Sequence, residues 1–241
     1  MSNNSSEQPE VPGSSAGQSI VSLLPNLLAV VAGLAAILFI SAGRLDWLQA
    51  WAFTLAFGGF LTGYGLWMLR NDPGQMNERS QVGQNTKTWD KVILTTYMVL
   101  LLTMLVLAGL DAGRFGWARA PLALQILGWC GAAFAGFVIF RTAAVNTFLS
   151  RTVRIQDDRG QRVIDTGPYA RVRHPMYLGI IVLMVSIPLL LGSLWALNPG
   201  AMIGILFIVR TALEDRTLQE ELPGYPEYAR RVRYRLFPWI W

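Results

Sequence analysis

Long runs of apolar residues alternate with short charged segments along the chain. Four of the runs are long enough to cross a bilayer whose hydrocarbon core is about 30 Å thick, because a helix rises about 1.5 Å per residue. None of these runs has the polar face that a soluble helix requires. We therefore predict four transmembrane helices, over Leu23–Ala42, Trp47–Leu69, Val92–Leu110 and Leu122–Val145.

The last apolar region has a different pattern, because turn residues divide it. Met176–Leu191 and Pro199–Val209 are each short, and the segment between them is rich in Gly, Ser, Asn and Pro. Turn residues at this density indicate a tight helical hairpin that enters and leaves on one side of the membrane. The predicted fold class is an all-α polytopic membrane protein, with four spans, this hairpin and a C-terminal surface helix.

Small residues recur four positions apart in two of the predicted spans. They are Gly59 and Gly63 in one span, and Gly128, Ala132 and Gly136 in another. Residues at this spacing share a helix face, which suits close contact between membrane helices. Gly and Ala are also common in membrane helices generally, so the pattern leaves a packing role open.

Both ends of the chain differ from its apolar middle. Residues 1–19 are rich in Ser, Asn and Gly and contain no Lys or Arg, so we predict a disordered tail and no signal peptide. Residues 20–145 are expected to form the four-helix bundle. Residues 146–241 are expected to hold a cofactor-binding loop, the hairpin and a basic helix on the membrane surface, in which Tyr225 and Tyr228 share one face.

The charges are few and unevenly placed. Only 15% of the 241 residues are charged, against about 25% in ordinary soluble domains. Of the 20 Lys and Arg, all but Arg44, Arg114 and Arg119 fall on the side of the 146–174 loop. This positive-inside pattern places that loop in the cytoplasm, and we expect a bacterial inner membrane. The net charge of +5 points to anionic lipids as partners, and not to nucleic acid.

The polar residues that could carry chemistry lie in the last third of the chain. Segment 154–164 alternates apolar and polar residues, which fits either a small β-hairpin on the membrane surface or a solvated loop. Pro175 stands where a helix can begin without losing a hydrogen bond, and the first turn of that helix favours an anionic group. His174, the only histidine, is adjacent to this helix start.

Arg210 and Glu214 are four residues apart and share a helix face. Arg210 follows a wholly apolar stretch, where a charge is costly unless it is paired or lines a cavity. Two interpretations remain, an ion pair with Glu214 that closes the hairpin or a functional site shared with His174. With one His and one Cys, the composition excludes a metal site rich in these residues. Cys130 is expected to be a packing residue.

Four motifs in series resemble the isoprenylcysteine carboxyl methyltransferase family and its relatives, the phospholipid N-methyltransferases. The resemblance implies an integral membrane enzyme that uses S-adenosylmethionine without a Rossmann domain. The first three spans carry no such motif, and Asp215 stands where many members have Glu. The motifs are Gly167-Pro-Tyr169, Arg173-His-Pro-Met-Tyr-Leu-Gly179, Arg210-x-x-x-Glu214-Asp215 with Leu218, and Gly224-Tyr225-x-x-Tyr228 followed by Val232 and Pro238.

The resemblance also implies roles for individual residues. In the family the cofactor lies between the loop before the hairpin and the second arm of the hairpin. Arg210 matches the arginine that the family places at the substrate, so Arg210 and Glu214 are the implied catalytic residues. The acceptor is expected to be lipid-like or apolar, with a carboxyl, amine or thiol group. The implied cofactor contacts are Gln156, Gln161, Arg162, Val163, Ile164, Tyr169, His174, Pro175, Met176, Tyr177 and Glu214.

Two other functions are alternatives to methyl transfer. A sterol-type membrane reductase that uses NADPH is expected to show an Asn-Tyr-x-Gly-Glu-like segment where this chain has 174–179. A non-catalytic transporter or scaffold is expected to carry functional residues at mid-membrane in several spans, and the first three spans offer none. The sequence favours methyl transfer over both.

Overall fold

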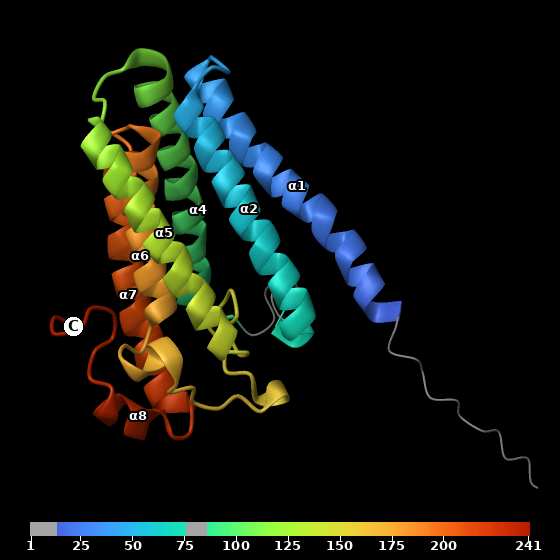
Figure 1. Cartoon of the computed structure of the whole chain (residues 1–241). Helices are drawn as coiled ribbons and strands as arrows, with labels where there is room; N and C mark the ends of the chain where they lie inside the picture. Colours follow the sequence, from blue (N-terminus) through green and yellow to red (C-terminus); the bar gives the residue numbers. More distant parts are fainter. Residues whose placement is uncertain (1–13, 76–85) are drawn as a thin grey trace, which may run out of the picture.

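The computed structural model describes residues 14–75 and 86–241, which form a bundle of long helices (Figure 1). Over the described residues no strand forms, apart from one isolated bridge between Arg119 and Ser193, so the predicted all-α fold class is confirmed. The helices are α1 (Ser14–Ala42), α2 (Leu48–Asn71), α4 (Thr88–Ala108) with its π-helical continuation η1 (Gly109–Phe115), α5 (Leu122–Val145), α6 (Pro175–Leu191), α7 (Leu197–Glu221) and α8 (Tyr225–Arg231), with short 3-10 turns η2 (Asp157–Arg159) and η3 (Gly167–Ala170).

The first four predicted spans are present, and the third is longer than predicted. It extends over Thr88–Phe115, where the sequence predicted Val92–Leu110. The difference arises because two carboxylates, Asp90 and Asp111, lie inside this helix and are fully buried. Each is hydrogen-bonded within the protein, so neither faces lipid, and the helix continues past both. Elsewhere large apolar side chains such as Ile40 and Leu55 are exposed, as a lipid environment allows.

The predicted hairpin is present and is formed by α6 and α7. Its second arm is longer than predicted, since it begins before Pro199 and continues to Glu221, which makes it a fifth helix able to cross a membrane. The tip reaches the loop that joins η1 to α5, where the Ala120 N–H donates to the Gly192 carbonyl at 2.9 Å. The arms therefore run the length of the bundle beside α4 and α5.

Asp111 explains how the turn residues of this tip are stabilised. Its carboxylate accepts a hydrogen bond from the Ser193 hydroxyl at 2.6 Å and others from the backbone N–H groups of Ala118 and Trp195. Buried polar groups need such partners, because a buried polar group without a hydrogen bond costs free energy. The carboxylate therefore fastens α4 and η1 to the tip of the hairpin.

Close packing between α5 and α6 depends on Gly128. A Cβ atom at this position would stand 2.5 Å from the Leu190 backbone nitrogen and 2.9 Å from the Ser186 carbonyl oxygen. The predicted packing role of the small residues is thus confirmed at Gly128. At Gly59 and Gly63 a Cβ would meet nothing within 4 Å, so these two glycines are not used for packing by the described residues.

We expect Gly128→Ala to lower the free energy of unfolding by about 1–3 kcal/mol, the usual cost of overpacking. The added methyl group meets backbone atoms, which cannot move aside without separating α5 from α6. Gly59→Ala, on an open helix face, is the matched control and should be neutral or stabilising. Thermal unfolding in detergent would measure both, and equal midpoints would contradict the packing role.

Two smaller expectations differ from the structure. Helix α1 begins at Ser14, so the end of the predicted tail at 1–19 is helical, and residues 1–13 lie outside the described part of the chain. Cys130 is exposed on α5 and is not the packing residue expected. The physical reason is helix rotation, because α5 presents Gly128 and Gly131 to α6 and turns Cys130 away.

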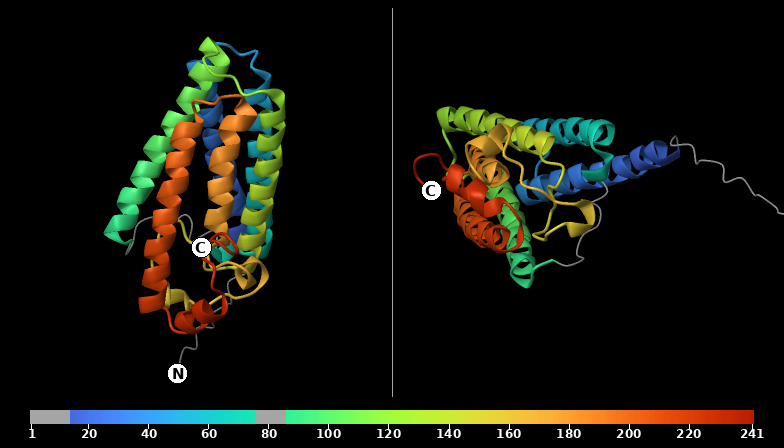
Figure 2. Two further views of the ribbon diagram at one scale, coloured as in Figure 1. Left: turned by 90° about the vertical axis from the view of Figure 1, so that its left-hand side faces the viewer. Right: turned by 90° about the horizontal axis from the view of Figure 1, so that it is seen from below.

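The chemistry-bearing segments gather at one end of the bundle. The loop between α5 and α6, the end of α7, and α8 lie together there, as the view from below shows (Figure 2). Segments as far apart in the sequence as Asn146 and Tyr228 thereby enclose one pocket.

Candidate functional site

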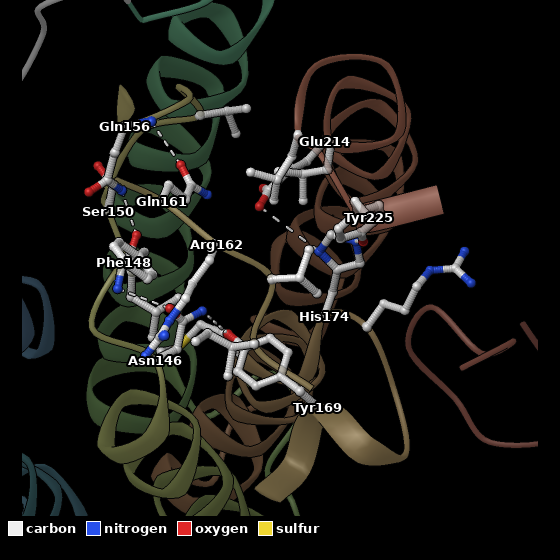
Figure 3. A pocket seen from close by; sticks show the side chains of 18 of the residues that line it. Asn146, Phe148, Ser150, Gln156, Gln161, Arg162, Tyr169, His174, Glu214 and Tyr225 are labelled. Atoms are coloured by element: carbon white, nitrogen blue, oxygen red, sulfur yellow. Dashed lines mark hydrogen bonds and ion pairs between the residues drawn. The ribbon is translucent and has the colours of Figure 1, made fainter. Parts of the chain in front are cut away.

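The pocket lies between the 146–164 loop on one side and α6, α7 and α8 on the other (Figure 3). Most of the residues predicted to contact a cofactor line it. Two predicted site residues do not, because Pro175 turns away from the pocket and Arg210 lies behind its wall. The predicted residues that line it are Gln156, Gln161, Arg162, Val163, Ile164, Tyr169, His174, Met176, Tyr177 and Glu214.

The 154–164 segment is a loop with a single 3-10 turn, so of the two predicted alternatives the β-hairpin was wrong. Gln156 closes this loop with its side chain, which donates to the Phe148 carbonyl at 2.6 Å and accepts from Arg159 at 2.7 Å. The Gln161 side chain in turn accepts from the Gln156 backbone N–H at 2.8 Å. The alternating polar residues therefore bond within the loop, and no second strand is needed to satisfy them.

Tyr169 joins the loop to α5 and α8. Its hydroxyl accepts a hydrogen bond from the Asn146 amide at 2.7 Å, and its carbonyl accepts one from the Tyr228 hydroxyl at 2.8 Å. It lies in the turn η3, which Gly167 enters with a positive φ of 59°. The Gly-Pro-Tyr motif therefore fixes one corner of the pocket.

Helix α8 forms where the sequence predicted a surface helix, but its two tyrosines pack against the pocket loop. Tyr225 and Tyr228 are buried and pack with Leu222 against Ile155 and Val163 of the loop. The face that was expected to rest on the membrane surface thus closes one side of the pocket.

Asp215 is the centre of a cluster of polar side chains beneath the pocket. Its carboxylate is fully buried and accepts two hydrogen bonds from the Arg173 guanidinium, at 2.7 and 3.0 Å. Such a two-pronged ion pair fixes both side chains in orientation as well as distance. The other members of this Asp215 cluster are Gln219, Tyr225 and Arg235, which donate at 2.8–2.9 Å, and His174, whose Nε2 lies 3.3 Å away.

Tyr225 is a permanent donor in this cluster. Burial raises the pKa of its hydroxyl above the usual value, and the negative charge of Asp215 raises it further. The hydroxyl therefore stays protonated at neutral pH and donates to Asp215 at 2.9 Å.

In the sequence, Asp215 stands out only as a departure from a family motif. An acidic residue beside Glu214 and an arginine in the preceding motif, Arg173, could have predicted this ion pair.

Glu214 is the carboxylate that faces the pocket. The Tyr177 hydroxyl donates a hydrogen bond to it, and Nδ1 of His174 lies 4.0 Å from its nearer oxygen. The rings of His174 and Tyr177 are parallel, with centroids 5.8 Å apart. The start of α6 thereby places three predicted site residues together, and Figure 3 shows Glu214 and His174 pointing toward one another.

Of the two interpretations of Arg210, the ion pair with Glu214 was wrong, because Arg210 pairs with Asp90 of α4. Its Nε and Nη2 donate to the two Asp90 carboxylate oxygens at 2.8 and 3.1 Å, and Nη2 also donates to the Arg151 carbonyl at 3.0 Å. Asp90 accepts a further bond from the Val153 N–H at 2.8 Å. The pair therefore connects α4, α7 and the pocket loop. No motif in the sequence pointed to Asp90.

The comparisons with known proteins bear on the segment that holds most of this geometry. None of the curated proteins matches the chain. A family match covers α5 after its first turns, the pocket loop, α6 and α7, and so includes Glu214, His174 and the Asp215 cluster up to Gln219. It confirms the predicted resemblance, and three of the four motifs fall within it. Residues 129–221 match the isoprenylcysteine carboxyl methyltransferase family.

Proposed function

We propose that this protein is an integral membrane methyltransferase that uses S-adenosylmethionine to methylate a lipid-like or apolar acceptor. One observation carries the proposal. The pocket that brings Glu214, Tyr177 and His174 together lies in the family-matched segment and directly adjoins helices long enough to cross a membrane. A soluble cofactor could enter it from the aqueous side, and an apolar acceptor from between the helices.

The chemistry of the pocket residues fits this cofactor. The side chains of Val163, Leu218 and Leu222 form an apolar wall suited to the adenine ring. No side chain of the described residues caps the start of α6, so the positive end of its dipole is available to the cofactor carboxylate. Glu214, whose side chain is about one-fifth exposed, suits the ammonium or hydroxyl groups. When bound, S-adenosylmethionine supplies an electrophilic methyl group on a sulfonium centre.

Methyl transfer places few demands on the protein. Because the leaving group needs no proton, the main requirements are to hold donor and acceptor in line and to exclude water. The Asp215 cluster holds His174 and α8 in place, and the buried Tyr225 and Tyr228 shield one side. If the acceptor carries a proton, the Glu214 carboxylate is positioned to take it.

We also propose that the pocket faces the cytoplasm of a bacterial cell. The Lys and Arg residues concentrate on the pocket side of the sequence, in keeping with the positive-inside pattern. S-adenosylmethionine is made in the cytoplasm, so this orientation also supplies the cofactor.

Isothermal titration of detergent-purified protein with S-adenosylhomocysteine and, separately, NADPH tests the proposal. We expect micromolar binding of the first only. Glu214→Gln and His174→Ala should each weaken it at least about tenfold, the loss of one good hydrogen bond to a charged group. Glu220→Gln is the matched control, because Glu220 is exposed on the same helix and outside the pocket. Binding of NADPH without binding of S-adenosylhomocysteine would contradict the proposal and favour a reductase.

A further inference from the structure

The segment after α8 carries the two most exposed large apolar side chains of the described residues. Trp239 and Ile240 are 87% and 81% exposed, and neither belongs to a membrane-spanning helix. Exposed apolar side chains on the spans face the lipid around the bundle, but this explanation does not extend to a segment outside the spans. Adjacent exposed apolar side chains mark a contact surface for another protein or for a membrane.

These two side chains belong to a compact turn at residues 235–241. The backbone N–H groups of Arg235, Leu236 and Phe237 all donate to the Trp241 carbonyl oxygen, at 3.0–3.2 Å. Trp239 has a φ of 65°, the only positive φ outside glycine among the described residues. Large side chains rarely adopt this conformation, so it persists only where the surrounding contacts enforce it. The turn is therefore a fixed structure that presents its apolar side chains outward.

Backbone hydrogen bonds attach the turn to the start of α6. The N–H groups of Arg173 and His174 donate to the Tyr234 and Arg235 carbonyls, each at 2.9 Å. The Arg235 guanidinium strengthens this attachment, because it donates to Asp215 at 2.9 Å. In Figure 1 the end of the chain is level with the lower part of α7, and α8 lies below it. The turn is thus closer to the spans than α8 is.

The length of α6 gives the depth of this attachment in the membrane. At the hairpin tip, Trp117 and Trp195 are 55% and 51% exposed, as residues of an aromatic belt at a membrane boundary are. The 17 residues of α6 rise about 26 Å from its start to that boundary, and the hydrocarbon core is about 30 Å thick. The start of α6 is therefore close to the opposite boundary, and the turn attached to it meets the lipid headgroups.

The charges beside the turn indicate which headgroups suit it. Three exposed arginines precede it, Arg230, Arg231 and Arg233. The first two pair with Glu227 and Asp165, whereas Arg233, the nearest to the turn, makes no ion pair with the described residues. An available cation next to exposed apolar side chains is complementary to an anionic membrane surface.

We propose that the turn at residues 235–241 is an interfacial anchor, whose Trp239 and Ile240 insert among anionic lipid headgroups of the leaflet on the pocket side. This inference does not depend on the proposed function. The sequence predicted a membrane contact for α8, and the anchor makes that contact instead, because the α8 tyrosines pack against the pocket loop. The anchor also adjoins the pocket, since the guanidinium of Arg235 lies 4.9 Å from the centroid of the Trp241 ring and donates to Asp215.

A fluorescent label on the anchor tests the insertion. Cys130 is the only cysteine, so Ile240→Cys in a Cys130→Ser background takes a single NBD group on the full chain. The labelled protein is placed in nanodiscs of phosphatidylcholine and phosphatidylglycerol. We expect blue-shifted emission, with about twofold or stronger quenching by lipids that carry a nitroxide near the headgroup, the depth at which interfacial segments lie. Emission typical of water, with quenching by aqueous iodide, would overturn the inference.

Glu220→Cys in the same background is the matched control. Its side chain is 57% exposed, and it lies near the end of α7, which continues past the level at which α6 starts. The label at this position should show emission typical of water and should be quenched by iodide and not by the lipid nitroxide. The same emission and quenching at both positions would contradict a specific insertion of the anchor.

Two further variants, each read with the label at position 240, test what holds the anchor in the membrane. Trp239→Asp places a charge on an exposed side chain, so the fold should be kept while the label moves into water. A label that stays blue-shifted would show that protein contacts shield it, and would contradict insertion into lipid. Arg233→Gln should remove the larger blue shift expected in phosphatidylglycerol than in phosphatidylcholine alone. Equal emission of the unsubstituted anchor in both lipids would contradict the preference for anionic headgroups.

Discussion

Replacing Asp215 by Ala should lower the free energy of unfolding by about 3–5 kcal/mol, because it leaves the Arg173 guanidinium buried without its counter-charge. Arg173 would keep only hydrogen bonds to backbone carbonyls, among them that of Val232 at 2.8 Å. The same change releases Tyr225 and Arg235, so α8 should loosen from the pocket. Chemical or thermal unfolding in detergent measures the first effect, and titration with S-adenosylhomocysteine should show weaker binding as the second.

Asp158→Ala provides the comparison for this variant. Asp158 pairs with Arg154 at 2.9 Å in the same region, but its side chain is 62% exposed. Hydrogen bonding from Arg154 lowers the pKa of Asp158, yet water screens so exposed a pair, and its removal should leave the unfolding midpoint unchanged. If Asp215→Ala unfolded at the same midpoint as Asp158→Ala, the Asp215 cluster would have no stabilising role.

Arg210→Lys should reduce methyl transfer on the order of 100-fold while binding of S-adenosylhomocysteine stays unchanged. Lysine keeps the charge but lacks the planar fork that meets both Asp90 oxygens and lies over the Tyr177 ring. In the role at the substrate that the resemblance implies for Arg210, the acceptor would then be held out of line, and misplacement by about 1 Å can cost this much in rate. Transfer of a labelled methyl group from S-adenosylmethionine into extracted membrane lipids measures the turnover.

The control for this prediction is Arg216→Lys, an exposed position on the same helix that pairs with Glu220 at 2.8 Å. It should leave both turnover and binding unchanged. Loss of S-adenosylhomocysteine binding in Arg210→Lys would mean that Arg210 mainly supports the structure of the pocket. Full activity would mean that its geometry does not matter to the reaction.

The spans could be predicted from the sequence because they depend on the length of an apolar run. The grouping of Glu214 with His174 and Tyr177, which stand in two different motifs, was implied by the family resemblance. The partner of Arg210 could not be predicted in this way. Asp90 is 120 residues away in the chain, and the contact depends on how α4 is rotated against α7. Apolar content alone placed the start of the third span at Val92, just after this aspartate.

The sequence does not locate the turn of the hairpin across the membrane, for a related reason. Gly192 and Ser193 indicate a turn, but they do not reveal where in the membrane the turn lies. That position is fixed by Asp111, which supplies the Ser193 hydroxyl with a partner from a different helix. The polar residues of a turn can therefore pack against a distant part of the chain when a carboxylate on another helix accepts their hydrogen bonds.

The long helix formed by α4 and η1 is anchored at both ends by a carboxylate, at the pocket by Asp90 and at the hairpin tip by Asp111. This helix therefore fixes the distance between the hairpin tip and the pocket. Helix α1, by contrast, leans away from the other helices toward its N-terminal end (Figure 1). We therefore expect such outer helices to tilt in a thinner or thicker bilayer, and the pocket to keep its shape across membranes of different lipid composition.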